Sequence, residues 1–152
     1  MMNRRTATRT VFASSLVVLA LAGCGQMRPS QKIDIFAATL SGAQEVPPAA
    51  TAATGQAEVM YNENTGKVSW KVTYSGLSAA PTAGHIHGPA AAGQNAGVVI
   101  PFASNLTSQP ITGETTITLA QYADLAAGLY YVNLHSSQFP GGEIRGQLRK
   151  RM

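Results

Sequence analysis

The stretch "KVSWKVTY", Lys67–Tyr74, decides the fold because polar and apolar side chains alternate along it without a break. Its apolar members are Val68, Trp70, Val72 and Tyr74. A period of two is typical of an antiparallel strand with one face against a core. The turn before it ends in Gly66, which can adopt positive φ, and "GQAEVMYN", Gly55–Asn62, alternates in the same way. The two segments predict a β-hairpin with the ring of Trp70 buried.

Strands are also predicted on either side of this hairpin. Six further segments are short, rich in β-branched and aromatic residues, and bounded by Gly, Pro, Asn or Ser: 32–40, 84–88, 97–102, 112–119, 129–135 and 142–149. About eight such strands favour an all-β fold, an antiparallel Greek-key-like β-sandwich. The proline-containing stretch 43–55 has no hydrophobic period, and we expect a loop that crosses between the two sheets.

One short helix is expected among the strands. Leu119, Tyr122 and Leu125 recur at helical spacing, and Gly128 follows at the position of a C-terminal cap. The aromatic residues elsewhere alternate with aliphatic ones, which favours core packing over an exposed carbohydrate platform. We expect Tyr131 alone to be available as a surface contact.

The N-terminus has the layout of a secretory signal. Three arginines precede an apolar run at 11–22, which is shorter than the ~20 residues of a membrane-spanning helix. The run ends in "LAGC", which resembles the lipobox of bacterial lipoproteins and implies cleavage before Cys24 and lipidation of its sulfur. We therefore expect a lipoprotein signal peptide at 1–23, a lipid-anchored tether at 24–32 and a folded domain at 33–149.

This layout also predicts where the protein acts. The lipid on Cys24 would hold the domain in the cell envelope on the extracytoplasmic side, at the outer membrane or periplasmic side if the organism is Gram-negative. Gly25 follows the cysteine where an aspartate would suggest retention at the inner membrane. Cys24 is also the only cysteine, so no disulfide can form within the chain.

The charge of the chain gives no support for a nucleic-acid partner. The formal net charge is +4, but three of the eleven basic residues lie in the signal, and the remainder has eight basic and seven acidic side chains. No basic stripe with interleaved aromatic residues is present. The partners expected are the membrane, through the lipid, and an unknown protein or envelope component.

The stretch "AGHIHGPA", Ala83–Ala90, contains two of the three histidines. On a strand His85 and His87 project to the same side, and His135 shares a face of its own strand with Asn133. If the two strands are neighbours, three imidazoles could bind copper or zinc and leave one coordination position open. The remaining candidates for a fourth ligand are Glu143 and a water molecule.

A structural polar network is the alternative interpretation of these histidines. Asn133, Glu143 and Arg145 would be its other members, because Glu143 and Arg145 are two residues apart on a predicted strand. Such a network would fix loops by hydrogen bonds and bind nothing. The chain has no G-x-S-x-G elbow and no evident pair of carboxylates, so we expect no catalytic residue.

Three separated motifs point to a known family. In order they are "ATLSGAQEVPP", "GHIHGPA" and "LAAGLYYVNLHSSQFPGGEIRGQL", and together they resemble the CHRD domain, the module repeated in chordin and found singly in many bacterial secreted proteins. The resemblance implies a β-rich extracytoplasmic domain and brings no established activity with it. The residues that match the family pattern are Glu45, Pro47, Pro48, His85, His87, Gly88, Asn133, His135, Pro140, Gly142, Glu143, Ile144, Arg145 and Gly146.

Two functions are therefore carried forward. The first is a lipid-anchored, non-catalytic binding or structural module. The alternative is a copper- or zinc-binding protein built on His85, His87 and His135, with redox chemistry as a further option.

Overall fold

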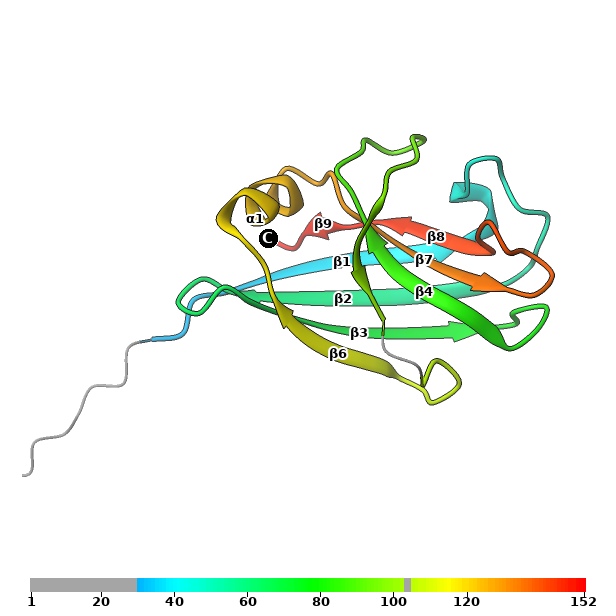
Figure 1. Cartoon of the computed structure of the whole chain (residues 1–152), viewed down its shortest axis with the longest axis horizontal. Coiled ribbons are helices and arrows are strands. Elements are labelled where there is room, and N and C mark those ends of the chain that lie inside the picture. The colour runs from blue at the N-terminus through cyan, green and yellow to red at the C-terminus, as the bar shows by residue number, and fades with distance from the viewer. Residues whose placement is uncertain (1–29, 103–104) are drawn as a thin grey trace, which may run out of the picture.

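A computed structural model of the chain describes residues 30–102 and 105–152. The predicted signal peptide, Cys24 and the tether as far as residue 29 lie outside the described residues. The elements in chain order are β1 (Ile33–Ser41), η1 (Gly42–Gln44), β2 (Thr54–Asn62), β3 (Lys67–Ser75), β4 (Pro81–His87), β5 (Val98–Pro101), β6 (Ile111–Thr116), α1 (Leu119–Ala126), β7 (Tyr131–Ser136), β8 (Ile144–Gln147) and β9 (Arg149–Lys150) (Figure 1).

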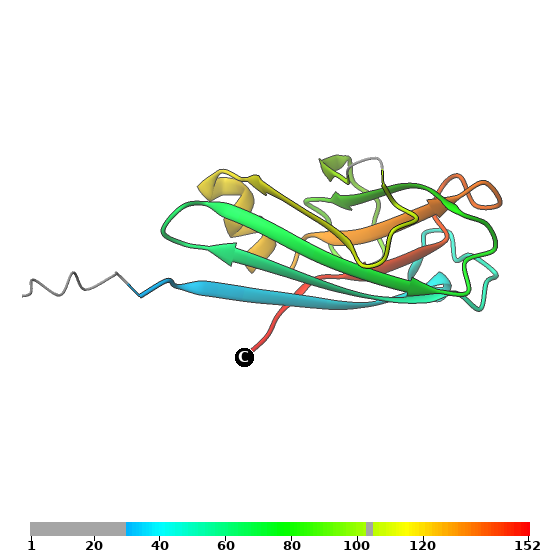
Figure 2. The same cartoon turned by 90° about the horizontal axis from the view of Figure 1, so that it is seen from below.

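The strands form one continuous antiparallel sheet in the order β5-β4-β7-β8-β1-β2-β3-β6, and β9 pairs with β1. The sheet curls on itself into two layers: in Figure 2 the orange strand β7 lies above the blue strand β1. The chain crosses between the layers from β3 to β4 and from β5 to β6. The prediction of an all-β antiparallel sandwich with one short helix is confirmed.

The hairpin of β2 and β3 forms the centre of one layer. The two strands pair along their whole length, from Thr54 opposite Ser75 to Asn62 opposite Lys67, and Gly66 in the turn has a φ of 70°. Trp70 is buried as predicted, with 6% of its surface exposed, and its ring stacks on Phe102 from the other layer at 5.3 Å between centroids. The alternation in β3 therefore points its apolar face into the space between the layers.

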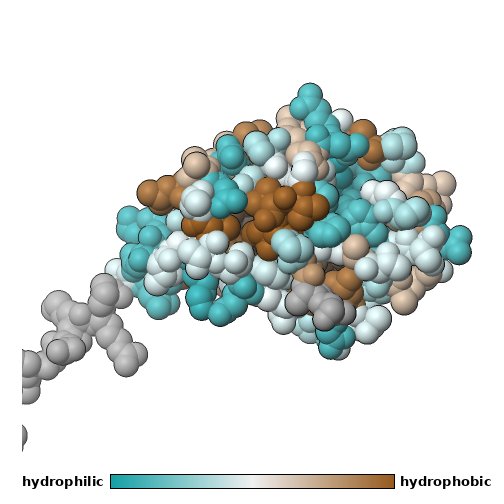
Figure 3. All heavy atoms as spheres, viewed as in Figure 1, coloured by the Kyte–Doolittle hydropathy of each residue, from teal (hydrophilic) through white to brown (hydrophobic). Residues whose placement is uncertain are grey.

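The edges of the curled sheet, β5 and β6, face a groove of about 410 Å³. Trp70, Val99, Phe102 and Ile117 are among its lining residues. Figure 3 shows a hydrophobic patch in the middle of this face, over β5. The patch marks the seam where the sheet does not close into a barrel.

One connection differs from its prediction. The loop that follows η1 was expected to cross between sheets, but it joins β1 to β2, which are neighbours with Ser41 opposite Thr54. The amide of Ala49 donates to the carbonyl of Gly42 at 2.9 Å, which folds the loop back over the end of β1. The expectation was wrong because a proline-rich sequence specifies an extended backbone locally but not the strand to which it returns.

The short helix α1 begins after β6 with a capping box. The hydroxyl of Thr118 accepts from the amide of Gln121, and the side chain of Gln121 accepts from the amide of Thr118. The strand predicted at 112–119 therefore ends at Thr116, because Thr118 caps the helix instead. Among the described residues no helix has the length and hydrophobicity needed to cross a membrane.

Candidate metal centre on the outer face of β4 and β7

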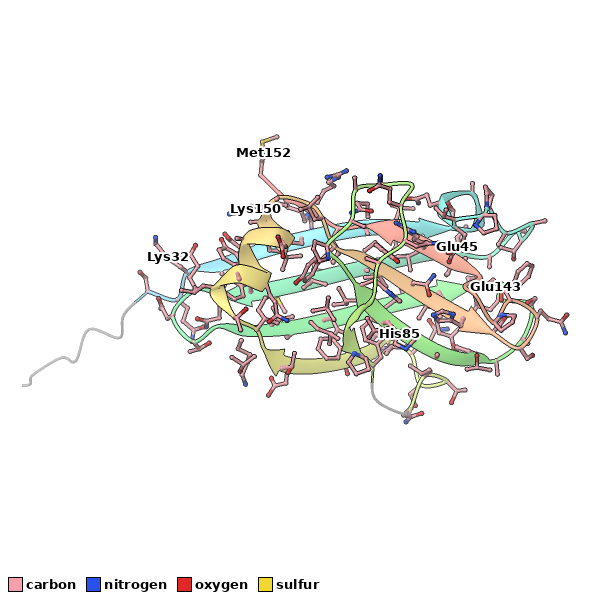
Figure 4. The ribbon with its side chains drawn as sticks, turned by 45° about the horizontal axis from the view of Figure 1, so that its top comes forward. Lys32, Glu45, His85, Glu143, Lys150 and Met152 are labelled. Carbon is pink, nitrogen blue, oxygen red and sulfur yellow. The ribbon has the colours of Figure 1, made fainter. Side chains whose placement is uncertain are left out.

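The pairing of β4 with β7 brings the three histidines together. In this register His85 is opposite Asn133, and His135 is opposite Ala83. Alternate residues of a strand share a face, and the intervening Ile86 and Leu134 are buried in the core. The histidines consequently lie on the outer face of the sandwich, and Figure 4 shows His85 on this part of the sheet.

The ring nitrogens of the histidines are close enough to bind one ion. Nδ1 of His85 and Nε2 of His135 are 3.1 Å apart, and one nitrogen from each of His85, His87 and His135 lies within 4.8 Å of the others. Nitrogens bound to zinc at ~2.0–2.1 Å in tetrahedral geometry are about 3.3 Å apart. Small side-chain rotations would therefore bring all three into coordination distance.

Two of the histidines are oriented by backbone carbonyls. Nδ1 of His87 lies 3.0 Å from the oxygen of Ala96, and Nδ1 of His135 lies 2.9 Å from the oxygen of Pro140. Because a carbonyl oxygen only accepts, each Nδ1 carries the proton and each Nε2 is an acceptor. Nε2 of His135 accepts from Nδ1 of His85 at 3.1 Å, and a bound ion would replace this hydrogen bond. Metal-binding histidines are commonly held in this way by a hydrogen bond from the second ring nitrogen.

Nε2 of His87 is buried and has no hydrogen-bond partner among the described residues. A buried acceptor without a partner costs free energy, on the order of 1–3 kcal/mol. His87 belongs to the group of three histidines whose ligand nitrogens lie within 4.8 Å of one another. An ion bound to Nε2 of His87 would satisfy this nitrogen.

Burial keeps the three imidazoles neutral. It is the largest cause of a lowered pKa in His85, His87 and His135. The positive charges that the neighbouring imidazoles would carry lower the pKa of His85 further. Neutral imidazole is the form that binds a metal ion.

Tyr131 and Arg145 form a stack over His87. The rings of His87 and Tyr131 are parallel to within 3° with centroids 4.9 Å apart, and the guanidinium carbon of Arg145 lies 3.4 Å from the centroid of Tyr131. The hydroxyl of Tyr131 accepts from the amide of Ala96 at 3.1 Å. Tyr131 is only 3% exposed, so the expectation that it offers a surface contact was wrong: the loop containing Ala96 covers it.

Glu45 joins this face from the loop after η1. Its carboxylate accepts from Nδ2 of Asn133 at 2.6 Å, and Figure 4 shows Glu45 near the end of β8. Burial raises the pKa of Glu45 to about 7, although the charge of Arg145 and the hydrogen bond from Asn133 act in the opposite direction. Gly142, with a φ of 135°, lies against the pair and leaves no room for a side chain. Glu45 was not predicted as a site residue; its signal in the sequence was its place within the "AQEVPP" motif.

Glu143 belongs to a different group. Its carboxylate accepts from the amide and hydroxyl of Ser78 at 2.7 and 2.9 Å and from the hydroxyl of Thr51 at 3.0 Å. Burial raises its pKa, but hydrogen bonds from Ser136, Ser78 and Thr51 outweigh burial and hold the pKa below its ordinary value. Glu143 thus fastens three loops together.

The expected network of Asn133, Glu143 and Arg145 is therefore divided in two. Asn133 and Arg145 are opposite each other on β7 and β8, whereas none of the hydrogen bonds of Glu143 goes to either of them. The strand β8 begins only at Ile144, so the alternation assumed for Glu143 does not apply. Glu143 is also absent from the group of residues that could bind a metal, which among the described residues consists of the three histidines.

The fold and this face define an antiparallel β-sandwich domain with a three-histidine cluster beneath surface loops. Comparison with family models gives a match to the CHRD domain over residues 36–148, and the chain belongs to the CHRD domain family. Searches among curated proteins and among solved structures gave no significant match.

Proposed function

We propose that this CHRD domain is a lipid-anchored, extracytoplasmic module that binds a transition metal ion, copper or zinc, through His85, His87 and His135. The observation that carries the proposal is that ligand nitrogens of the three histidines lie within 4.8 Å of one another, together with the buried Nε2 of His87, which has no hydrogen-bond partner among the described residues. A purely structural network would supply a donor to this nitrogen. The cluster offers three neutral ligands, and a tetrahedral ion bound to all three would have one further coordination position.

The carbonyls of Ala96 and Pro140 support this proposal because they place the ring protons on Nδ1 and leave Nε2 of His87 and His135 unprotonated. Imidazole ligands suit both copper and zinc. Binding a protein or envelope partner without metal is the second candidate function. It is supported by the groove at the seam between β5 and β6, which is lined in part by Trp70, Val99 and Phe102.

The test is a titration of the tag-free domain with copper and zinc while the melting temperature is followed. Metal at 100 times its Kd should stabilise the wild type by about 2.7 kcal/mol. His87→Gln, which removes the free Nε2, should lose this rise, and Gln138→Ala, an exposed substitution in the β7–β8 connection, should retain it. If neither metal raises the wild-type melting temperature, the proposal is wrong and the three histidines have a structural role only.

A further inference from the structure

Arg145 is a buried cation that forms no salt bridge with a carboxylate among the described residues. Its side chain is 2% exposed, and its guanidinium donates to two neutral oxygens, Oδ1 of Asn95 at 3.0 Å and the carbonyl of Gln94 at 2.6 Å. The ion pairs formed by residues 30–102 and 105–152 do not include Arg145. A buried charge without a counter-ion acts strongly on its surroundings because little solvent screens it.

This charge is directed at the three-histidine cluster. The guanidinium lies on one face of Tyr131, and His87 is parallel to that ring at 4.9 Å. Because the ring of Tyr131 packs against both groups, no layer of water separates the guanidinium of Arg145 from the imidazole of His87. An ion bound at a ring nitrogen of His87 would lie at the edge of the imidazole that packs on Tyr131, the same ring that the guanidinium contacts.

The cluster contributes no negative charge of its own. Its three members are imidazoles, and it contains no cysteine, aspartate or glutamate. The nearby carboxyl of Glu45 is hydrogen-bonded to Asn133 and forms no ion pair with Arg145. An ion in the cluster therefore adds its whole charge to a site that is already positive, and the repulsion doubles between a monovalent and a divalent ion.

We propose that the cluster binds monovalent copper in preference to divalent copper and zinc, and that Arg145 sets this preference as a positioning residue that acts through Tyr131 and His87. The inference rests on the proposed function, because it requires the three histidines to bind a metal. Imidazole suits both copper and zinc, whereas the thiolate and thioether ligands that select Cu(I) are absent from the three-histidine cluster. The preference for the monovalent ion is therefore assigned to the fixed charge of Arg145.

Three variants that each lower the net charge by one test the proposal. Arg145→Gln removes the cation, Asn95→Asp places a carboxylate beside it at an exposed loop position, and Lys71→Gln removes an exposed cation from β3, three strands from β8. Arg145→Lys retains the charge. Affinities for Cu(I), under exclusion of oxygen, and for Cu(II) and zinc are measured with competing chelators, together with the melting temperature of each variant.

The measurements are made at about pH 6.5, below the pKa of about 7 of Glu45, so that this neighbouring carboxyl is largely protonated. The wild type should bind Cu(I) more tightly than either divalent ion. Arg145→Gln and Asn95→Asp should each reduce the ratio of Cu(I) to Cu(II) affinity by about tenfold, which lowers the copper reduction potential by about 59 mV. Lys71→Gln and Arg145→Lys should leave the ratio within about threefold of wild type.

The outcomes separate this inference from the proposed function. A wild type that binds no metal overturns both. If the wild type binds zinc or Cu(II) as tightly as Cu(I), the preference for Cu(I) is wrong but the metal site is not contradicted. The same holds if the ratio of Cu(I) to Cu(II) affinity is unchanged in Asn95→Asp. If Arg145→Gln does not fold, Asn95→Asp alone decides, because it keeps the guanidinium and its stack.

Discussion

At Glu45, burial outweighs two interactions that favour the charged form. The residue is 6% exposed and accepts a hydrogen bond of 2.6 Å from Asn133. The charge of Arg145 also favours its ionisation, yet its pKa rises to about 7. The folded state therefore binds a proton at this position over a range of pH in which the unfolded chain has lost it.

Replacing Glu45 with Gln should remove this pH dependence. A pKa raised from 4.5 to about 7 means that the contribution of Glu45 is fully present below pH 4.5 and is lost as pH rises to 7, at a cost of about 3 kcal/mol. Gln keeps an oxygen to accept from Asn133 but does not titrate. Denaturant unfolding of both proteins between pH 4 and 8 should show that the variant gains stability relative to wild type as pH rises.

The histidines titrate in both proteins, so their effect cancels in this difference. Their lowered pKa values make the stability of each protein fall as pH drops through the folded and unfolded pKa of histidine. A difference between Glu45→Gln and wild type that stays constant from pH 4 to 8 would show that Glu45 is not the titrating group.

Single residues differed in how far the sequence could place them. His85 and His87 were predicted to project together, because the period of a strand is a local property. The position of His135 depended on whether its strand was a neighbour. In the structure β4 pairs with β7, so the strand of His135 is a neighbour of the strand that contains His85 and His87. The two strands are about fifty residues apart in the chain, and no local sequence pattern specifies their pairing.

Among the elements, β3 shows the closest agreement between pattern and structure. Val68, Trp70 and Val72 are buried, and Lys71 is exposed. Trp70 packs against Phe102 and against the backbone of Gly113, which is opposite it on β6. Trp70 of β3 thereby contacts the other layer and the edge strand β6.

Trp70→Ala should destabilise the domain by about 3–5 kcal/mol, because it leaves a cavity between the layers. Lys71→Ala, one residue later on the opposite face, should change the free energy of unfolding by no more than about 0.5 kcal/mol. Urea unfolding followed by circular dichroism measures both. Equal losses in the two variants would contradict the burial of the indole ring.

The elements that departed from prediction lie at chain reversals. The loop after η1 returns to the neighbouring strand, and Glu143 lies before β8 begins and not within it. Both are held by contacts between distant loops, such as the hydrogen bond from Thr51 to Glu143. The conformations of these two segments depend on tertiary contacts, which cannot be predicted from the local sequence.

For the whole molecule, the proposed membrane attachment depends on the segment that precedes the described residues. The sequence "LAGC" resembles a lipobox, and no helix in the described part of the chain has the length and hydrophobicity to span a bilayer. A single lipid chain binds membranes only marginally, so stable anchoring requires the multiple chains that a lipoprotein carries. The proposed location therefore rests on one side chain, Cys24.

Cys24→Ser should release the protein from the membrane fraction or leave it unprocessed, because serine lacks the thiol that receives the lipid. Fractionation of cells followed by mass measurement of the product checks this. Ser30→Ala, a change in the tether that leaves the lipobox intact, is the control and should remain membrane-bound. A Cys24→Ser protein that is still processed and membrane-bound would contradict the lipid anchor.

The sequence by itself determined the all-β class, the hairpin of β2 and β3, the short helix and the shared face of His85 and His87, because these follow from the period of side chains along a strand or helix. The tertiary structure alone decided which strands are neighbours. It thereby decided that His135 joins the other histidines, that Arg145 lies over Tyr131 with no salt bridge to any described residue, and that Glu143 accepts hydrogen bonds from other loops. The physical reason is that strand pairing is fixed by burying the core faces of all the strands at once, and the outer face receives whichever polar residues that register places opposite one another.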